Sequence, residues 1–136
     1  MVVRSFKAVA AAIALIAGTT GAMAQQNIRI GALYPLSGQV AKSGEDTLNA
    51  IKLAIDIINK KHEGIDLPFA KTEGLPKLGG AKFELIAADH QGAPEVGQAE
   101  AERLIEGQKV VALIGAFHSS VAAASSQVAE RMGVPF

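Results

Sequence analysis

Apolar positions along the chain form two kinds of pattern, short continuous runs and longer stretches with helical spacing. The continuous runs predict three β-strands, at residues 28–33, 82–88 and 110–114. The helical spacing predicts three helices, at residues 43–61, 95–106 and 119–132. Strands that alternate with helices predict an α/β fold of the order βαβαβα, with a parallel sheet, right-handed crossovers and helices on both faces of the sheet.

The last strand and the first helix carry further expectations about burial. Residues 110–114 are uninterrupted by polar side chains and rich in β-branched ones, as is typical of a strand buried on both faces. The polar side chains of the helix at 43–61 crowd into an arc of roughly a hundred degrees, so we expect this helix to be covered on more than one side. The sheet and a neighbouring helix would suffice for this, and a partner subunit could also supply the cover.

Residues 63–81, between the first helix and the second strand, are rich in glycine and proline. A connection of that length without clear periodicity is unusual in a compact domain. The segment is therefore functional, disordered or a small hairpin, and the sequence leaves these three alternatives open.

The two ends of the chain also carry information. Arg4 and Lys7 precede the apolar run of residues 8–17, and small residues follow as far as Ala22-Met23-Ala24. This three-part pattern predicts a secretory signal peptide over residues 1–24. The apolar run is too short to span a bilayer as a stable helix. At the other end, residues 134–136 resemble the start of a fourth strand, so we expect residues 25–136 to be the first part of a longer exported protein.

Composition excludes several classes of function. Thirteen basic residues balance thirteen acidic ones and form no basic patch, which argues against nucleic acid or an anionic membrane as a partner. Cysteine is absent, which removes disulfides and thiol chemistry, and the three histidines lack the paired spacing of a zinc site. Neither a G-x-G-x-x-G motif nor a P-loop is present. We therefore expect no metal and no cofactor.

Candidate ligand-binding residues lie where the strands end. In an open parallel sheet, ligands bind beyond the carboxyl ends of the strands, at the point where the strand order reverses. If the first and third strands are neighbours, residues 34–43 and 115–120 line one crevice. Ser119 could then offer its hydroxyl group and nearby backbone amides to a carboxylate at a helix start. A plainer interpretation is that Ser119 or Ser120 caps the helix, and both interpretations can hold together.

A hydrolase is the alternative of another class. Ser119 or Ser120, His90 or His118, and Asp89 supply the residue types of a catalytic triad. However, no G-x-S-x-G motif surrounds either serine, so we expect no catalytic residues and no enzymatic activity.

The signal and several segments in a fixed order resemble the periplasmic substrate-binding proteins of branched-chain amino acid ABC transporters, the leucine/isoleucine/valine-binding type. The segments are residues 31–38 (Gly-Ala-Leu-Tyr-Pro-Leu-Ser-Gly), Gly44, residues 88–92 (Ala-Asp-His-Gln-Gly) and residues 113–120 (Leu-Ile-Gly-Ala-Phe-His-Ser-Ser). The resemblance implies a type I periplasmic binding protein, in which two lobes close over a ligand and deliver it to an inner-membrane permease. It implies that residues 25–136 are the beginning of the first lobe, truncated before its fourth strand.

The same resemblance implies the role of individual residues. The position of Ser119 binds the carboxylate of the ligand, and the positions of Phe117 and His118 contribute to the pocket. The position of Ser43 often carries an aromatic side chain, so serine here weakens the case for a branched-chain amino acid. The full candidate set is Ser119, His118, Phe117, Ser120, Ser43 and Ser37.

The expected function is therefore a periplasmic solute-binding component of an ABC importer for a small carboxylate, with an amino acid as the first candidate. An exported sensor of the same fold, specific for amides or aromatic acids, is the runner-up.

Overall fold

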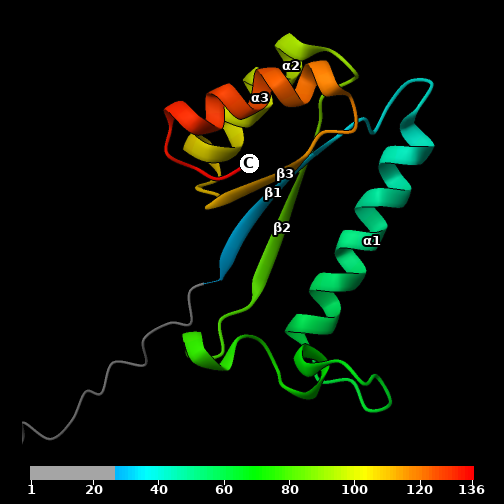
Figure 1. The fold of residues 1–136 in the computed structure, drawn as a ribbon, viewed down its shortest axis with the longest axis vertical. Helices are drawn as coiled ribbons and strands as arrows, with labels where there is room; N and C mark the ends of the chain where they lie inside the picture. Colours follow the sequence, from blue (N-terminus) through cyan, green and yellow to red (C-terminus); the bar gives the residue numbers. More distant parts are fainter. Residues whose placement is uncertain (1–26) are drawn as a thin grey trace, which may run out of the picture.

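The computed structural model describes residues 27–136, so the predicted signal peptide lies outside the described residues. Three parallel strands form one sheet in the order β2-β1-β3 (Figure 1). The strands are β1 (Ile28–Tyr34), β2 (Phe83–Asp89) and β3 (Ala112–Gly115). Strand β1 pairs with β2 along its whole length, from Ile28 opposite Phe83 to Tyr34 opposite Asp89. The parallel sheet confirms the α/β prediction.

Helices lie on both faces of the sheet, as predicted. Helix α1 (Ala41–Asn59) covers one face, and α2 (Pro94–Glu102) and α3 (Ser119–Arg131) cover the other (Figure 1). Helix α2 continues into a π-helical turn, η3 (Arg103–Gly107), before the chain enters β3. The apolar spacing predicted these elements because each helix has to bury its apolar side against the sheet.

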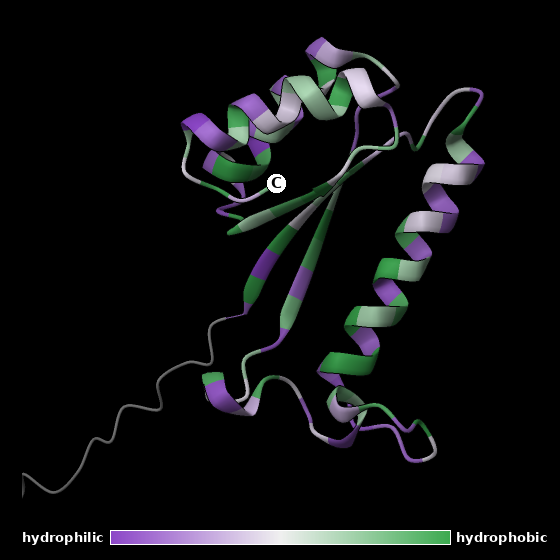
Figure 2. Cartoon of the chain, in the orientation of Figure 1, coloured by the Kyte–Doolittle hydropathy of each residue, from purple (hydrophilic) through white to green (hydrophobic). Residues whose placement is uncertain are grey.

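The main core lies between the sheet and the pair α2 and α3. Its centre contains Leu33 of β1, Leu104 of η3 and Val121 of α3, all fully buried. Small residues allow the two helices to approach closely: a side chain added at Gly97 of α2 would come within 2.9 Å of the Ser125 hydroxyl on α3. Figure 2 shows hydrophobic residues alternating with hydrophilic ones along the two helices of this layer.

The expectation that α1 is covered on more than one side is wrong within residues 27–136. Only Gly44 and Leu48 of α1 are buried, and the Leu53 side chain is 62% exposed. The reason is that α1 is the one long helix on its side of the described sheet (Figure 1). A smaller apolar cluster, built around Ala32, Tyr34 and Leu48, joins α1 to the sheet.

The same lack of cover corrects the prediction that residues 110–114 are buried on both faces. Val110 and Leu113 are buried, but Val111 is 56% and Ile114 is 37% exposed. The side chains of Leu113 and Ile114 point to opposite faces, as successive residues of a strand do, and α1 packs against β1 and β2 instead. Leu113 donates its backbone N–H to the Pro135 carbonyl at 2.9 Å, so residues 134–136 run beside β3.

The segment of residues 63–81 is composed of two short 3₁₀ turns and one isolated bridge. The turns are η1 (Pro68–Lys71) and η2 (Pro76–Leu78), and Leu75 forms an antiparallel bridge with Ala81. The hairpin alternative is thus realised only as a single bridge. The segment lies at the end of the sheet where the strands begin (Figure 1). Within the described part of the chain, no helix combines the length and the apolar character needed to cross a membrane.

Candidate ligand-binding site

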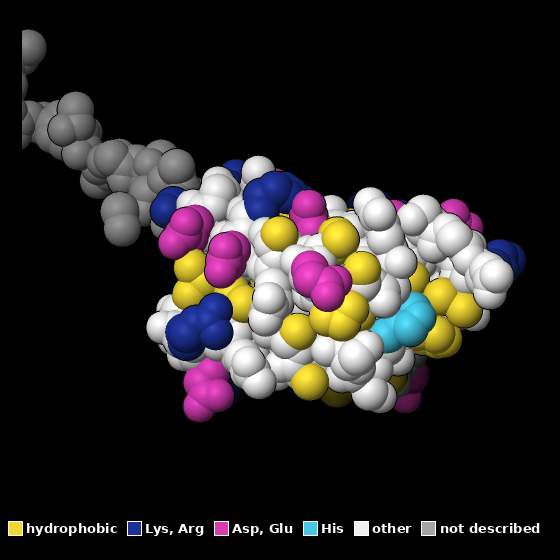
Figure 3. All heavy atoms as spheres, turned by 90° about the horizontal axis from the view of Figure 1, so that it is seen from above, with side chains coloured by type: hydrophobic (Ala, Val, Ile, Leu, Met, Phe, Trp, Pro, Cys, Tyr) yellow, Lys and Arg dark blue, Asp and Glu magenta, His cyan; other side chains and the backbone are white. Residues whose placement is uncertain are grey.

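Three loops meet at the carboxyl edge of the sheet. They are residues 35–40 after β1, residues 90–93 after β2 and residues 116–118 after β3. Leu33 pairs with Gly115, so β1 and β3 end side by side, and the strand order reverses at β1. This meets the condition under which residues 34–43 and 115–120 would line one crevice. Figure 3 looks onto this edge from above, where a histidine reaches the surface among hydrophobic and uncharged polar groups.

Helix α3 begins at Ser119 without a side-chain cap. The N-cap residue is His118, with φ −86° and ψ 124°, and no side-chain hydrogen bond caps the helix. The interpretation that Ser119 or Ser120 caps the helix is therefore wrong, because both residues already lie inside its first turn. The first amide to donate to an N-cap carbonyl is that of Ala122, which bonds to His118 at 2.9 Å. The amides of residues 119–121 precede it and have no acceptor within the helix.

Ser119 and Ser120 are exposed at this helix start. The free amides and the helix dipole both favour a negative charge at this position. An exposed serine hydroxyl next to them adds one more donor. This end of α3 therefore has the chemistry needed to hold a carboxylate.

Phe117 has an unusual backbone conformation. Its φ is +83°, in the left-handed region that is uncommon for a large L-residue, and its side chain is 56% exposed. The ring meets His118 edge-on, with centroids 5.4 Å apart. The turn after β3 thus presents an aromatic ring at the surface next to the free amides.

His118 leans back onto the loop after β2. Its ring stands edge-on to the ring of His90, with centroids 5.4 Å apart and an interplanar angle of 85°. A side chain added at Gly92 would lie 3.5 Å from the His118 ring. The Nδ1 atom of His118 is buried and, among residues 27–136, finds no hydrogen-bond partner. His118 thus packs against the loop after β2 and also places beside the turn a buried nitrogen that has no hydrogen-bond partner in the described part of the chain.

Asp89, the last residue of β2, binds the loop that follows β1. Its Oδ1 atom accepts the backbone N–H of Leu36 at 2.9 Å and that of Gln91 at 2.8 Å. Burial raises the pKa of Asp89, but hydrogen bonds from the Ser37 side chain and from the amides of Gln91 and Leu36 outweigh burial and lower the pKa below its ordinary value. Ser37, a predicted ligand residue, thus lies close to the Asp89 carboxylate.

The lowered pKa of Asp89 leads to a prediction about acid stability. A carboxyl group whose pKa is lower in the folded state stabilises the fold above its ordinary pKa of about 3.9 and loses that contribution as the pH falls through the folded value. We expect the free energy of unfolding to drop more steeply below about pH 4 in the wild type than in Asp89→Asn. Urea denaturation at neutral and acid pH measures both slopes. Asp66→Asn, at a highly exposed carboxylate, is the control, and equal slopes for Asp89→Asn and wild type would refute the prediction.

His90 is a residue whose importance the sequence did not reveal. It directly follows the end of β2 and is fully buried, and both ring nitrogens bond to backbone atoms. Nε2 lies 2.8 Å from the Ala116 carbonyl oxygen, and Nδ1 lies 2.9 Å from the Gly92 amide nitrogen. A histidine that follows a strand is ordinarily read as exposed, so only the tertiary structure shows this arrangement.

Ser43 lies in the first turn of α1 and is exposed. Its carbonyl oxygen accepts the Thr47 hydroxyl at 2.9 Å. Gly44 beside it brings α1 so close to Pro35 that an added methyl group would overlap the Pro35 carbonyl oxygen. The N-terminus of α1 is thereby pinned to the loop after β1, at the same edge of the sheet as Ser119.

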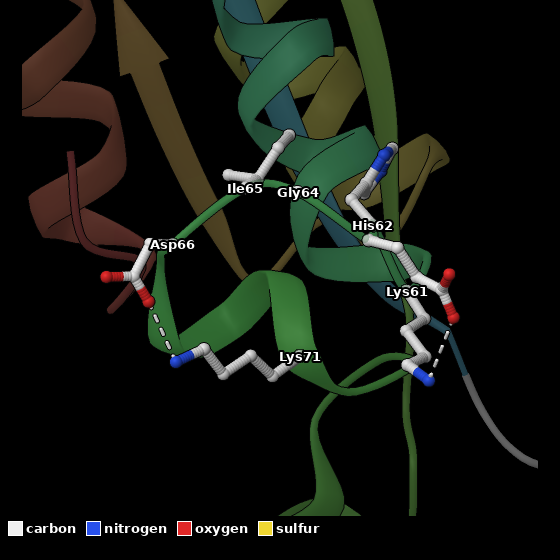
Figure 4. Close-up of a pocket in the computed structure, with 7 residues that line it drawn as sticks. Lys61, His62, Gly64, Ile65, Asp66 and Lys71 are labelled. Atoms are coloured by element: carbon white, nitrogen blue, oxygen red, sulfur yellow. Dashed lines mark ion pairs between the residues drawn. The ribbon is translucent and has the colours of Figure 1, made fainter.

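A separate hollow of about 360 Å³ lies after the end of α1 (Figure 4). It is lined by residues 61–66 and Lys71. Its charged side chains pair with one another, Lys61 with Glu63 at 3.6 Å and Lys71 with Asp66 at 2.8 Å. The hollow is shallow, lies at the opposite end of the sheet and takes no part in the candidate site.

The catalytic alternative finds no geometric support. Backbone atoms occupy both nitrogens of His90 and the Oδ1 atom of Asp89, so these residues are not arranged as the base and orienting acid of a triad. In the part of the chain that the structure describes, no three potential ligands gather closely enough to hold a metal ion.

Comparison with known proteins gives a consistent result. The sequence profile of a family described as "Periplasmic binding protein" matches residues 27–136. The Leu/Ile/Val-binding protein homolog 7 of Brucella suis is 35% identical over 125 residues, which cover 90% of this chain and 27% of that protein.

Solved structures agree with the fold. An ABC transporter substrate-binding protein from Sphaerobacter thermophilus superposes with a TM-score of 0.63 and 29% identity, over 80% of this chain and 25% of that one. A solute-binding protein of an ABC transporter from Rhodopseudomonas palustris BisB5, in complex with 3,4-dihydroxybenzoic acid, has a TM-score of 0.60 and 26% identity, over 80% of this chain and 26% of that one. The chain thus spans about a quarter of the length of these relatives.

Proposed function

The chain belongs to the periplasmic binding protein family, and from that membership we propose that it is the beginning of the first lobe of a two-lobed solute-binding protein. The family members that match it are substrate-binding proteins of ABC transporters and not enzymes. We propose that the protein binds a small carboxylate between its lobes and delivers it to an inner-membrane permease. A signal peptide over residues 1–24 and a periplasmic location belong to the same proposal.

The observation that carries the proposal is the position of the start of α3. Ser119 and the free amides of residues 119–121 lie at the carboxyl edge of the sheet, beside the end of β1, where the strand order reverses. A carboxylate placed there would accept hydrogen bonds from the serine hydroxyl and from backbone N–H groups. The ligand pocket would be completed by the second lobe.

The relatives narrow the class of ligand. One is named for leucine, isoleucine and valine, and another was solved with 3,4-dihydroxybenzoic acid. The feature that these ligands share is a carboxylate, which is the group that the start of α3 suits. The exposed ring of Phe117 offers an apolar surface for the remainder of either kind of molecule.

Ser119→Ala tests the proposal in the full-length protein. A thermal-shift screen with leucine, isoleucine, valine, benzoate and 3,4-dihydroxybenzoate first identifies a carboxylate that raises the melting temperature. We then expect Ser119→Ala to weaken the binding of that compound by about 1.5 to 3 kcal/mol, because it removes a hydrogen bond to a charged group. Titration calorimetry measures the loss.

Ser126→Ala is the matched control, because Ser126 lies two turns further along α3 and bonds to the Ala123 carbonyl at 3.2 Å. It should leave the affinity unchanged. Equal affinities of wild type and Ser119→Ala would remove Ser119 from the site.

A further inference from the structure

We infer that Asp89 and His90 together clamp the two ligand loops to each other, and that His90 is a positioning residue of the proposed carboxylate site. The inference rests on the proposed function for its consequence in binding. Its structural basis is independent of any ligand, because it follows from hydrogen bonds that join the ends of all three strands.

Asp89 holds the first loop. Its Oδ1 atom accepts the amide of Leu36, a residue 53 positions away in the sequence, and the amide of Gln91 in its own loop. The backbone amide of His90 adds a bond of 3.3 Å to the Tyr34 carbonyl. The beginning of the loop after β1 is therefore tied to the end of β2 through two consecutive residues.

His90 holds the second loop across the central strand. Strand β2 is separated from β3 by β1, yet the His90 ring bonds to Ala116 in the turn after β3. Ala116 is itself buried and lies three residues before Ser119. The single bond from Nε2 to the Ala116 carbonyl thus ties the edge strand to the turn that presents Ser119.

The two partners of His90 determine its tautomer. The Gly92 amide can only donate, so Nδ1 must be the acceptor, and the Ala116 carbonyl can only accept, so Nε2 must carry the hydrogen. Both bonds exist together only in the neutral Nε2–H form. Each nitrogen therefore has a distinct role: Nδ1 shapes the loop after β2, and Nε2 holds the turn after β3.

The packing around the ring supports this assignment. His118 lies edge-on to His90, and Gly92 lies beside the His118 ring, where an added Cβ would be 3.5 Å away, an ordinary contact distance. His118 is the residue directly before Ser119, so this ring contact gives the turn a second point of attachment to His90, besides the bond to Ala116. A rigid turn is what a site needs when a few donors must all point at one small ligand group.

Two substitutions separate the roles of the nitrogens. The Oδ1 atom of His90→Asn can replace Nδ1 as an acceptor but leaves the Ala116 carbonyl without a donor. The side-chain amide of His90→Gln can replace the Nε2 donor. In the full-length protein we expect His90→Asn to shift the amide resonances of Ala116 and Ser119 and to weaken binding of the carboxylate that scores in the screen by about tenfold or more. We expect His90→Gln to keep the Ala116 and Ser119 amide resonances close to their wild-type positions and to retain most of the wild-type affinity.

A third measurement needs neither a variant nor a ligand. In protein labelled with ¹⁵N-histidine, we expect the His90 ring to show a protonated Nε2 and an unprotonated Nδ1. The opposite tautomer would overturn the clamp even if both variants failed to fold.

Unshifted Ala116 and Ser119 amides in His90→Asn would also overturn the clamp, and shifted amides with unchanged affinity would overturn the positioning role. If no tested carboxylate binds the wild type, the proposed function fails on that ground, while the tautomer and the amides still decide whether the clamp exists.

Discussion

Leu33→Ala is expected to lower the free energy of unfolding by about 3 to 5 kcal/mol, the upper range for truncation of a buried leucine. Leu33 is fully buried near the carboxyl end of the central strand and belongs to the core beneath α2 and α3. Gly115 of β3 packs directly against it, so no flexible side chain on that side can move in to fill the space. The cavity would therefore persist, and its cost would add to the lost burial of the removed methyl groups.

Urea denaturation of the full-length protein, followed by circular dichroism, measures this loss. Leu78→Ala is the matched control, because the same atoms are removed from a side chain that is largely exposed in η2. We expect the control to change the stability by no more than about 0.5 kcal/mol. A loss below about 1 kcal/mol for Leu33→Ala would contradict the packing described for this layer.

Gly44→Ala is expected to destabilise the protein by about 3 kcal/mol, at the upper end of the cost of overpacking. The added methyl group would overlap the Pro35 carbonyl oxygen, and neither backbone can yield without moving a secondary-structure element. The N-terminus of α1 would have to separate from the loop after β1. Since that loop is also bound to Asp89, we expect the Leu36 and Gln91 amides to shift as well.

Gly107→Ala is the control for this effect. A methyl group at Gly107 would meet no atom nearer than the Arg103 Cγ at 3.9 Å, an ordinary contact distance. Replacing glycine where space allows reduces the freedom of the unfolded chain, so this variant should be neutral or more stable by up to about 1 kcal/mol. Equal effects of the two substitutions in urea denaturation would show that α1 does not approach Pro35 as closely as described.

The elements and their order could be predicted from the sequence because an element that buries one face has apolar residues at a regular spacing. The face of α2 that contains Gly97 and Ala101 is buried, and the boundaries of all three strands lie within two residues of the prediction. The adjacency of β1 and β3, on which the crevice depends, is only a condition at the level of the sequence, and the strand order of the structure meets it.

Burial by other elements could not be predicted in the same way. Leu53 and Ile114 are as apolar as their buried neighbours, and their pattern indicates that something should cover them, but not what. The described residues leave both exposed. The apolar pattern of a segment predicts that its side chains are buried. Which elements bury them depends on the tertiary arrangement of the rest of the chain.

The hydrogen bonds at the carboxyl edge of the sheet could not be predicted from the sequence either. Residue types alone suggest that a serine caps α3, yet the N-cap residue is His118, and Ser119 is the first residue of the helix. The roles of Asp89 and His90 depend on residues more than twenty positions away, to which no local pattern refers. The ligand contacts of Ser119, His118, Phe117, Ser120, Ser43 and Ser37 remain predictions.

The bonds that converge on the end of β2 bear on any attempt to redesign specificity. Positions 89 and 90 each bond to two segments of backbone, so a substitution there would disturb several loops at once and would make a poor starting point for a library. Phe117 and Ser120 are exposed and take no part in the hydrogen bonds of Asp89 and His90, so they can be varied without breaking those bonds. Under the proposed function, randomising those two positions, with 89 and 90 held constant, is the economical route to a changed ligand preference.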